Sequence, residues 1–401
     1  MGHETARLVD DAERRARLAR RHALHPRHRL SDPEAATRAM VVLHATEAAS
    51  VHLSVQARTE SVAPADVDRA LYEDRGIVKQ LAMRRTLFVF PRDLLPAAWG
   101  STSARVAAEQ RRLVTRDAQR HGIAADGEAW LDAARDAVVE RLSAAEPMSA
   151  KQLREELPEL SGAITINEGK KYGGTFNLAP RVLGCLGAEG LLVRGPNAGH
   201  WRLSKPSWTL MDAWLGEDLV PLDADQGYAE LVRRWLRTFG PGTLEDVQWW
   251  LGATKGATRA ALEAVGAVAV GLEDGRTGWL LPDDVEPVPA VEPWAALLPT
   301  LDPTTMGWKE RGFYLDPDHT PLLFDTNGNA GTTAWWDGRI VGAWVQDDEG
   351  TVGVVLSPGA DVGSDGRAAL DHEAERLTMW LDGVRISNVY SSRLMKGARL
   401  P

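Results

Sequence analysis

The chain has 401 residues, a formal net charge of −10 and a single cysteine, Cys185. One cysteine excludes a disulfide within the chain, and no apolar run approaches the roughly 18 residues that a membrane-spanning helix needs. No signal-peptide pattern opens the sequence, so we expect a cytoplasmic protein that does not enter a membrane. At roughly 100–200 residues per domain, the length allows two to four separate cores.

Charge is distributed unevenly along the sequence. Residues 14–29 contain seven arginines and no acid, and residues 84–120 contain eight arginines and three acids, a balance of +5. Residues 165–205 contain six lysines or arginines and two acids, a balance of +4, whereas acids collect in 283–318 and 345–375. Because DNA responds to the local charge of a surface, this segregation favours DNA binding despite the negative total. The alternative is that the arginine runs are solvated helix faces.

The first region opens with a helix signal. Ser31-Asp32-Pro33-Glu34 supplies a cap, an early proline and a glutamate three residues after the serine. The polar group His44-Ala45-Thr46-Glu47 follows the apolar end of this segment, and a further segment reaches residue 58. A capped helix is predicted at 64–72, followed by a stretch that contains Met83-Arg84-Arg85-Thr86-Leu87 and ends at Pro91.

Two later regions repeat a plan of helices followed by a hairpin. The first repeat has predicted helices at 105–121, 130–143, 149–157 and about 178–188, then strands at 191–194 and 200–203 around a turn-rich tip at 195–199. The second has helices at 228–239, 243–251 and 255–265 and a hairpin at 267–281 with its turn at Asp274-Gly275. Three helices and a two-stranded wing are the element order of the winged-helix fold.

A proline-rich linker separates these repeats from the C-terminal region. Four prolines between positions 282 and 293 favour an extended connection. Beyond the linker we expect a β-rich region with a hairpin at Trp336-Asp337-Gly338-Arg339 and a helix near 368–381. The predicted class is α+β, with tandem winged-helix units and a C-terminal β-rich domain. The predicted boundaries are 1–120 for the N-terminal basic helix and first unit, 121–210 and 211–285 for the second and third units, and 286–401 for the last domain.

Several of these segments resemble one known family. The run around His44-Ala45-Thr46, the Met83-Arg84-Arg85-Thr86-Leu87 segment, and the stretches 297–303, 307–311 and 336–344 are similar to AlkZ/YcaQ-type DNA glycosylases. In that family a Gln-apolar-Gln or Gln-apolar-Asp motif stands where this chain has His44-Ala45-Thr46, and a glycine stands where it has Arg85. The resemblance implies hydrolysis of the N-glycosidic bond of a bulky N7-alkylated purine, without a metal or an organic cofactor. The expected partner is double-stranded DNA that carries such purines, and we expect the protein to be a monomer.

Three residues are the catalytic candidates. Glu47 offers a negative charge for an oxocarbenium-like sugar, and His44 and Thr46 offer groups that can hold a water molecule. A structural alternative is that Thr46 caps a helix beginning at Glu47 while His44 lines a groove. Because His52 would lie roughly 12 Å from His44 along a helix, a metal site built on both is not expected. A non-catalytic winged-helix protein that regulates or binds damaged DNA is the alternative function.

The DNA-binding candidates are basic residues in the three positive segments. The main face is predicted to combine Arg84, Arg85, Arg111, Arg112, Lys170 and Lys171. The hairpin of the second unit is expected to add Arg194, His200 and Arg202, because a small, turn-prone tip allows the backbone to approach DNA closely.

Overall fold

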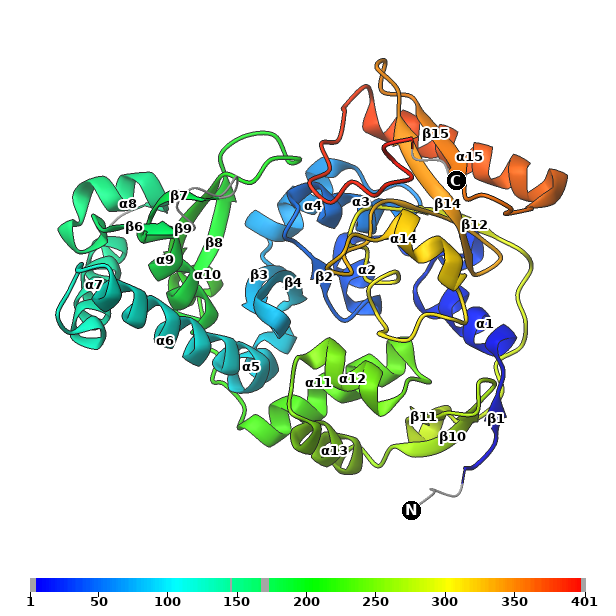
Figure 1. The fold of residues 1–401 in the computed structure, drawn as a ribbon, viewed down its shortest axis with the longest axis horizontal. Coiled ribbons are helices and arrows are strands. Elements are labelled where there is room, and N and C mark those ends of the chain that lie inside the picture. The colour runs from blue at the N-terminus through cyan, green and yellow to red at the C-terminus, as the bar shows by residue number, and fades with distance from the viewer. Residues whose placement is uncertain (1–4, 145, 167–172, 398–401) are drawn as a thin grey trace.

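The computed structural model describes residues 5–144, 146–166 and 173–397. Its helices and small sheets form an α+β protein, as predicted. A central sheet lies between a helical lobe on one side and a C-terminal sheet with its long helix on the other, and a third group of helices closes the lower edge (Figure 1). None of the helices in the described ranges is both long and apolar enough to span a membrane.

The first region surrounds a three-stranded sheet of order β2-β4-β3. Its helices are α1 (Asp11–Arg21), α2 (Pro33–Ala39), α3 (Ala48–Arg58) and α4 (Pro64–Tyr72), and its strands are β2 (Leu43–His44), β3 (Ile77–Ala82) and β4 (Thr86–Pro91). Helix α2 begins where the sequence predicts, because the Asp32 carboxylate accepts a hydrogen bond of 2.8 Å from the Ala35 N–H and Pro33 is the first helical residue. Most of the residues of α3 are buried, which places this helix inside the molecule.

The next region forms a lobe with its own hydrophobic core. Its helices are α6 (Ala104–Arg120), α7 (Gly127–Ser143), α8 (Ala150–Glu156) and α9 (Ala179–Ala188), and its strands are β5 (Met148–Ser149), β6 (Ala163–Ile166), β7 (Gly174–Asn177), β8 (Leu192–Asn197) and β9 (Pro206–Leu210). The flanking helices α5 (Leu95–Ala98) and α10 (Met211–Leu215) pack into the larger core around the central sheet. The predicted capped helix is confirmed, since Ser149 and Gln152 form a reciprocal capping box at the start of α8.

The predicted hairpin of this lobe is wrong in its second arm. Strand β8 pairs with β9, so the returning strand is not 200–203 but lies several residues later. The Asn197 side chain explains the shift: its Nδ2 donates to the Leu203 carbonyl at 2.9 Å and its Oδ1 accepts from the Lys205 N–H at 2.7 Å. These bonds hold residues 198–205 as a wide loop where the sequence suggested a tight tip.

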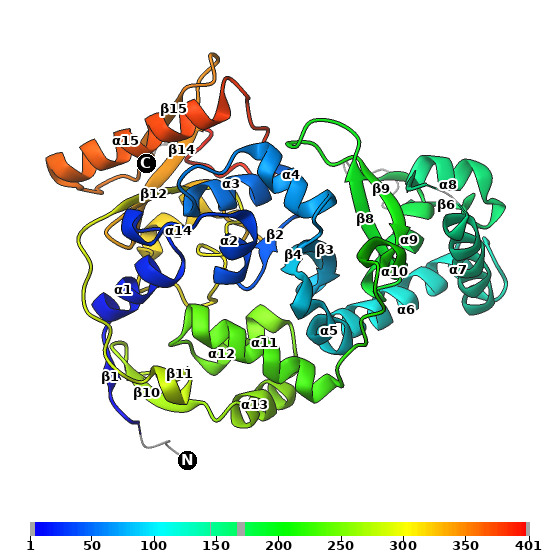
Figure 2. The ribbon, with the colours of Figure 1, turned by 180° about the vertical axis from the view of Figure 1, so that it is seen from behind.

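The third group contains three helices and a hairpin, in the order predicted. These elements are α11 (Ala224–Phe239), α12 (Leu244–Leu251), α13 (Lys255–Ala264), β10 (Val268–Leu272) and β11 (Thr277–Leu280). A strand that the sequence did not predict, β1 (Leu8–Val9), adds to this hairpin by pairing in parallel with β10. The N-terminal segment therefore lies beside the third group, as both views show (Figures 1 and 2).

The C-terminal region is a four-stranded sheet covered by one long helix. Its elements are β12 (Ala295–Leu298), α14 (Thr320–Leu323), β13 (Thr333–Trp336), β14 (Arg339–Gln346), β15 (Val352–Leu356) and α15 (Gly363–Leu381). The predicted Asp337-Gly338 turn joins β13 to β14, and both residues have positive φ angles, 48° and 75°. That geometry suits a tight hairpin turn between twisted strands.

Arginines of the N-terminal run are held by acidic partners. Arg17 is 1% exposed and contacts Glu13 and Asp284. Arg21 also binds Asp284, at 2.5 Å, and Arg29 binds Glu373 at 2.6 Å. The expectation of a solvated or DNA-facing surface is wrong for these side chains, because acids from distant parts of the chain neutralise them.

Candidate active site and DNA-binding surface

The segment that carries the catalytic candidates joins strand β2 to helix α3. His44 is the last residue of β2 and pairs with Phe88 of β4, and the Ala45 N–H donates to the Leu87 carbonyl at 2.9 Å. The chain then leaves the sheet, and α3 begins at Ala48. This junction places His44, Thr46 and Glu47 between the central sheet and the C-terminal region.

His44 is buried and held as a neutral imidazole. Burial, with a smaller contribution from the Arg84 guanidinium, lowers the pKa of His44 to about 3. Its Nδ1 accepts from the Thr46 N–H at 3.4 Å, and its ring meets the edge of Phe88 with centroids 5.3 Å apart. Because Nδ1 is the acceptor, the proton of the neutral ring belongs on Nε2. His44 can therefore donate one hydrogen bond from Nε2.

Glu47 is buried at the end of the same segment, and its carboxylate is anchored on one side only. Its Oε1 accepts from the N–H groups of Val389 and Tyr390, at 2.6 and 3.1 Å. Within the described ranges its Oε2 makes no hydrogen bond. Burial raises the pKa of Glu47, and the two backbone donors oppose that rise. One oxygen thus fixes the carboxylate while the other can interact with a ligand or a water.

Thr46 does not take the capping role that the sequence allowed. The residue is exposed, and the N-cap of α3 is Glu47, which makes no side-chain hydrogen bond to the helix. The structural alternative in which Thr46 caps a helix that starts at Glu47 is therefore wrong. The Glu47 carboxylate points instead to a loop more than 340 residues later in the chain.

Helix α3 is fixed to the C-terminal region along its length. Near its start, the Ser50 hydroxyl donates to the Thr300 carbonyl at 2.7 Å. At its end, Arg58 forms a fully buried two-bond contact with Asp302, at 2.7 and 2.8 Å. Such a pair is held firmly because breaking it would leave a buried charge without compensation. The position of Glu47 is therefore determined by both regions.

Arg84 and Arg85 form the turn between β3 and β4. Both have positive φ angles, 55° and 59°, which are uncommon for residues with a side chain. The Arg84 guanidinium lies over the Trp249 ring, 3.9 Å from its centroid. Burial and the nearby Arg311 lower the pKa of Arg84 to about 10, so it stays a cation at neutral pH. The turn therefore brings positive charge next to His44.

The structure does not bring all predicted DNA-binding residues together. Arg111 on α6 binds Glu128 and Asp132 of α7, each at 2.7 Å, whereas Arg112 is exposed and forms no ion pair with any described residue. Lys170 and Lys171 lie outside the described residues.

The predicted hairpin residues lie in two different places. Arg194 lies 5.3 Å from the Trp208 ring in the crevice that also contains Lys79. His200 and Arg202 belong to the exposed 198–205 loop, and Arg202 donates to the Arg385 carbonyl at 2.6 Å. Trp201 of this loop packs against His52 and Trp380, with ring centroids 4.9 and 5.5 Å away. The loop is thus docked on α3 and α15.

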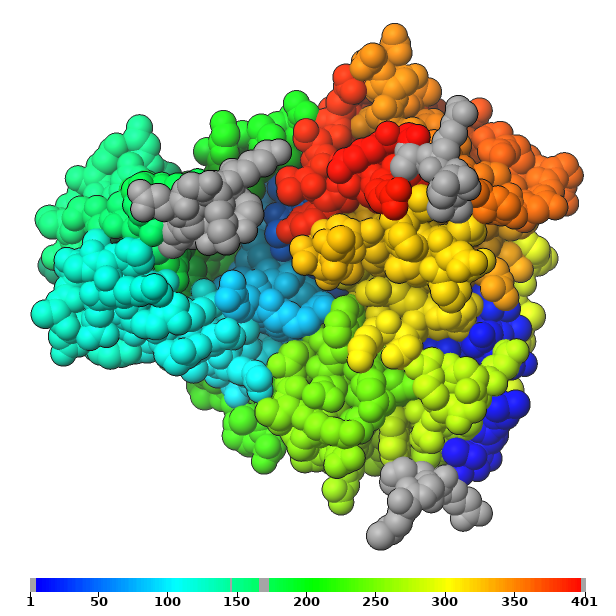
Figure 3. All heavy atoms as spheres, in the orientation of Figure 1, coloured from blue at the N-terminus to red at the C-terminus, as the bar shows by residue number. Residues whose placement is uncertain are grey.

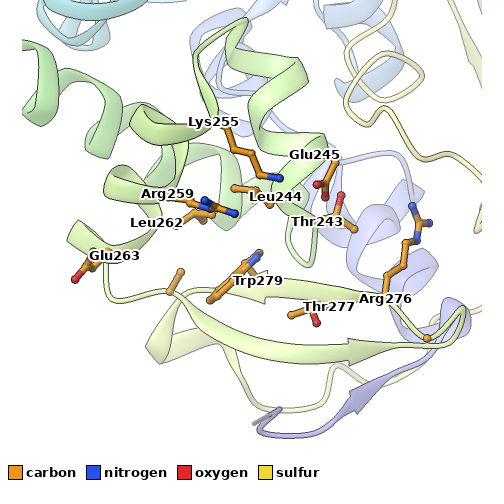
Figure 4. Close-up of a pocket in the computed structure, with 12 residues that line it drawn as sticks. Thr243, Leu244, Glu245, Lys255, Arg259, Leu262, Glu263, Arg276, Thr277 and Trp279 are labelled. Atoms are coloured by element: carbon orange, nitrogen blue, oxygen red, sulfur yellow. The ribbon is translucent and has the colours of Figure 1, made fainter. Parts of the chain in front are cut away.

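A wide pocket lies elsewhere, in the third group of helices. It has a volume of about 870 Å³ and lies between α12, α13 and the β10–β11 hairpin. Figure 4 shows Lys255 and Arg259 together with Glu245 around it. On its wall Arg276 is already engaged by Asp274 and Glu310. Charges of both signs line this pocket, so it lacks the one-sided potential that a nucleic-acid backbone favours.

In the described ranges, no three histidine, cysteine or acidic side chains are grouped to hold a metal ion.

Comparison with known proteins identifies the family. A model of the family described as DNA glycosylase AlkZ-like matches residues 37–380. The chain belongs to the AlkZ-like DNA glycosylase family. The solved structure of Streptomyces sahachiroi DNA glycosylase AlkZ is similar, with a TM-score of 0.72 and 20% identity over 94% of this chain and 98% of that chain. At this identity the likeness shows the fold alone. A search of curated proteins gave no match.

Membership of the AlkZ-like DNA glycosylase family confirms the prediction of the family and supports a glycosylase that acts on DNA.

Sequence reasoning missed three cations near Arg84, namely Arg105, Lys309 and Arg311. Arg311 stands within a segment that the resemblance had marked, and Arg105 within the predicted basic helix. Only the fold shows that they adjoin the β3–β4 turn.

Proposed function

We propose that the protein removes bulky N7-alkylated purines from double-stranded DNA by hydrolysing their N-glycosidic bond. In this proposal Glu47 is the catalytic carboxylate, and His44 and Thr46 assist it. The observation that carries the proposal is the Glu47 carboxylate, which is buried, anchored through Oε1 by two backbone N–H groups and free at Oε2 of any hydrogen bond to a described residue.

The chemistry needs little beyond this arrangement. Alkylation at N7 gives the purine a positive charge, so the base leaves as a neutral molecule when the bond from C1′ to N9 breaks. The sugar becomes an oxocarbenium-like cation, and a nearby carboxylate stabilises it. Water then adds its oxygen to C1′ and gives a proton to the Glu47 carboxylate, which leaves an abasic site and the free base.

The neighbouring residues have smaller roles in this proposal. His44 is neutral at physiological pH, so its Nε2–H can donate a hydrogen bond to the attacking water or to the departing base. Thr46 is exposed beside it and offers a hydroxyl at the mouth of the site.

We also propose that the segments 1–120, 121–210 and 211–285 are winged-helix units. In this arrangement the duplex is contacted by Arg84, Arg85, Arg112 and the 198–205 loop. The protein acts as a monomer.

The test is base release from DNA that contains N7-alkylguanine, measured as abasic sites in single-turnover reactions. Glu47→Gln should lower the rate by on the order of 10²-fold, because it removes the charge that acts in the transition state. Glutamine keeps an oxygen for the Val389 and Tyr390 N–H groups, so the fold and DNA affinity should stay nearly unchanged. His44→Ala and Thr46→Ala should cost less.

Controls separate chemistry from folding. Glu60 is exposed two residues after the end of α3, and Glu60→Gln should release base at the wild-type rate. Glu47→Ala should lose both the charge and the anchor, so it should melt at a lower temperature than Glu47→Gln. If Glu47→Gln releases base at the wild-type rate, Glu47 is not the catalytic carboxylate.

A non-catalytic damage-binding protein is the second candidate function. It is favoured by the use of Glu47 as an anchor for residues 389–390, and by the lack of a glutamine or aspartate at the positions of His44 and Thr46. This function predicts tighter binding to alkylated than to unmodified duplex, without abasic sites after prolonged incubation. The same alkylated DNA, assayed for both binding and base release, distinguishes the two functions.

A further inference from the structure

Five cationic side chains gather around the β3–β4 turn without acidic partners. They come from three parts of the chain: the turn itself, the start of α6, and the loop that follows residue 306. Within the described ranges none of them forms an ion pair, although most other arginines of the chain do. We call this group the cationic strip, and its members are Arg84, Arg85, Arg105, Lys309 and Arg311.

The strip lines two neighbouring hollows that share Arg84. One, of about 380 Å³, is bordered by Arg84, Arg85 and Arg105 together with a single acid, Glu109. The other, of about 140 Å³, is bordered by Arg84, Lys309 and Arg311 and by the turn of residues 327–329. In Figure 3 the light-blue surface around position 85 meets the green surface of α12 and the yellow surface of the later loops. The two hollows adjoin at Arg84, and the cations that border them come from three regions of the chain.

In the part of the chain that the structure describes, the charged groups of the second hollow are held in place by contacts other than ion pairs with carboxylates. The Arg84 guanidinium lies on the Trp249 ring, and Arg311 lies 4.6 Å from the Phe324 ring. The loop that carries Lys309 is fixed by the fully buried Asp246, which accepts from the Lys309 and Glu310 N–H groups at 2.9 Å each. Two like charges, those of Arg84 and Arg311, are thus kept near each other and repel until an anion lies between them.

Arg85 adds a second observation. Its φ angle of 59° follows the 55° of Arg84, so two successive residues with side chains adopt a backbone that glycine adopts freely. Backbone strain of this kind is concentrated at functional sites. A cation placed at a position that suits glycine points to a function for its charge.

We propose that the cationic strip binds consecutive phosphates of one DNA strand and holds that strand beside His44 and Glu47. This inference rests on the proposed function for its DNA substrate and adds Arg105, Lys309 and Arg311 to the residues that bind it. Guanidinium and ammonium groups without acidic partners suit phosphodiester oxygens, and the adjacent turn at Asn327-Gly328-Asn329 adds polar groups at one end.

The position of the strip gives it a role near the reacting nucleotide. Strand β4 begins at Thr86, directly after Arg85, and Phe88 of this strand pairs with His44. Phe88 is three residues after Arg85, a distance of about 10 Å along an extended strand, so the turn lies within about two nucleotides of His44. A phosphate bound at Arg84 and Arg85 would therefore leave a neighbouring sugar near His44.

The test is binding of an undamaged fluorescent duplex, followed by anisotropy over a range of salt concentrations. Arg85→Gly and Lys309→Gln should each weaken binding about tenfold at low salt and lower the log–log salt slope by about 0.9. Arg85→Gly should not lower the melting temperature, because glycine relieves the positive φ. Undamaged DNA makes this result independent of base release, so failure of the proposed glycosylase would leave it unaffected.

A matched control is Arg237→Gln, since Arg237 is exposed on α11 and already paired with Asp283 at 2.6 Å. Its affinity and salt slope should equal those of the wild type. Competition by polyglutamate and by inorganic phosphate identifies the ligand chemistry, and unlabelled duplex should compete far better than either. Unchanged affinity and slope in both strip variants, or equal competition by polyglutamate at equal charge, would overturn the proposal.

Discussion

Two groups of arginines in this protein have the same chemistry and opposite surroundings. The N-terminal run has the densest positive charge in the sequence, yet Arg17, Arg21 and Arg29 contact Glu13, Asp284 and Glu373 in the fold. The cationic strip is assembled from three separated segments, and none of its members has an acidic partner among the described residues.

The comparison shows that local charge density in a sequence does not by itself identify a nucleic-acid surface. The linker that follows the third group brings Asp284 beneath α1, where it neutralises two arginines of the run. Among the described residues no carboxylate forms an ion pair with Arg84, and Trp249 supports its guanidinium instead. The first arrangement stabilises the packing of α1 on the linker, and the second leaves charge free for a ligand.

The largest expected effect is on stability and concerns Arg17. Arg17→Met should lower the free energy of unfolding by about 3 kcal/mol, because it removes a buried partner of Glu13 and Asp284. Urea denaturation measures the loss. The salt slope of DNA binding should not change at a temperature where the variant is folded. A lower slope for this variant would break the comparison, since it would place the N-terminal run on the DNA surface.

The next effect is on binding and concerns Arg84. Arg84→Gln should weaken binding of undamaged duplex about tenfold, or about 1.4 kcal/mol, without lowering the free energy of unfolding. Stability should be kept because the substitution also removes the repulsion between Arg84 and Arg311. Arg84→Lys keeps the charge but loses the planar stacking on Trp249, so its affinity should be intermediate. Equal affinities of the wild type and Arg84→Gln would contradict the role of the strip.

Features that depend on neighbouring residues could be predicted from the sequence. The Asp32 cap of α2, the capping box at Ser149 and the Asp337-Gly338 turn each require only a few adjacent residues. Long-range contacts could not be predicted. Strand β1 pairs with β10 across about 260 residues, a register that no local pattern specifies.

The candidate site likewise combines residues that the sequence alone could select with long-range contacts that it could not. His44, Glu47 and Arg84 stand in segments whose order resembles a known family, so the sequence alone selected them. The anchoring of Glu47 by the Val389 and Tyr390 N–H groups and the approach of Arg311 to Trp249 depend on how the C-terminal region folds back. Backbone donors carry no sequence signature, and for this reason the one-sided anchoring of Glu47 became visible only in the structure.

The smallest expected effect is the pH dependence of the stability that Glu13, the acidic partner of Arg7 and Arg17, contributes to the fold. Burial raises the pKa of Glu13, but hydrogen bonds and charge from Arg7 and Arg17 outweigh it and leave the pKa below its ordinary value of 4.5. A carboxyl whose pKa is lowered on folding contributes stability that is present above its unfolded pKa and is lost as the pH falls through the folded value. Glu13→Gln should therefore be less stable than the wild type by about 1 kcal/mol near neutral pH, and this difference should shrink as the pH falls below about 4.5. Urea denaturation of both proteins across that range measures it, with the exposed Glu60→Gln as the control that should show no such change. Because Glu109 is the one acid among the described residues that border the two hollows, the difference in DNA affinity between the wild type and Lys309→Gln should stay constant from neutral pH down to about 5. A pH-independent stability difference for Glu13→Gln would show that its ion pairs with Arg7 and Arg17 contribute no net stability, and the contrast between the two arginine groups would then rest on geometry alone.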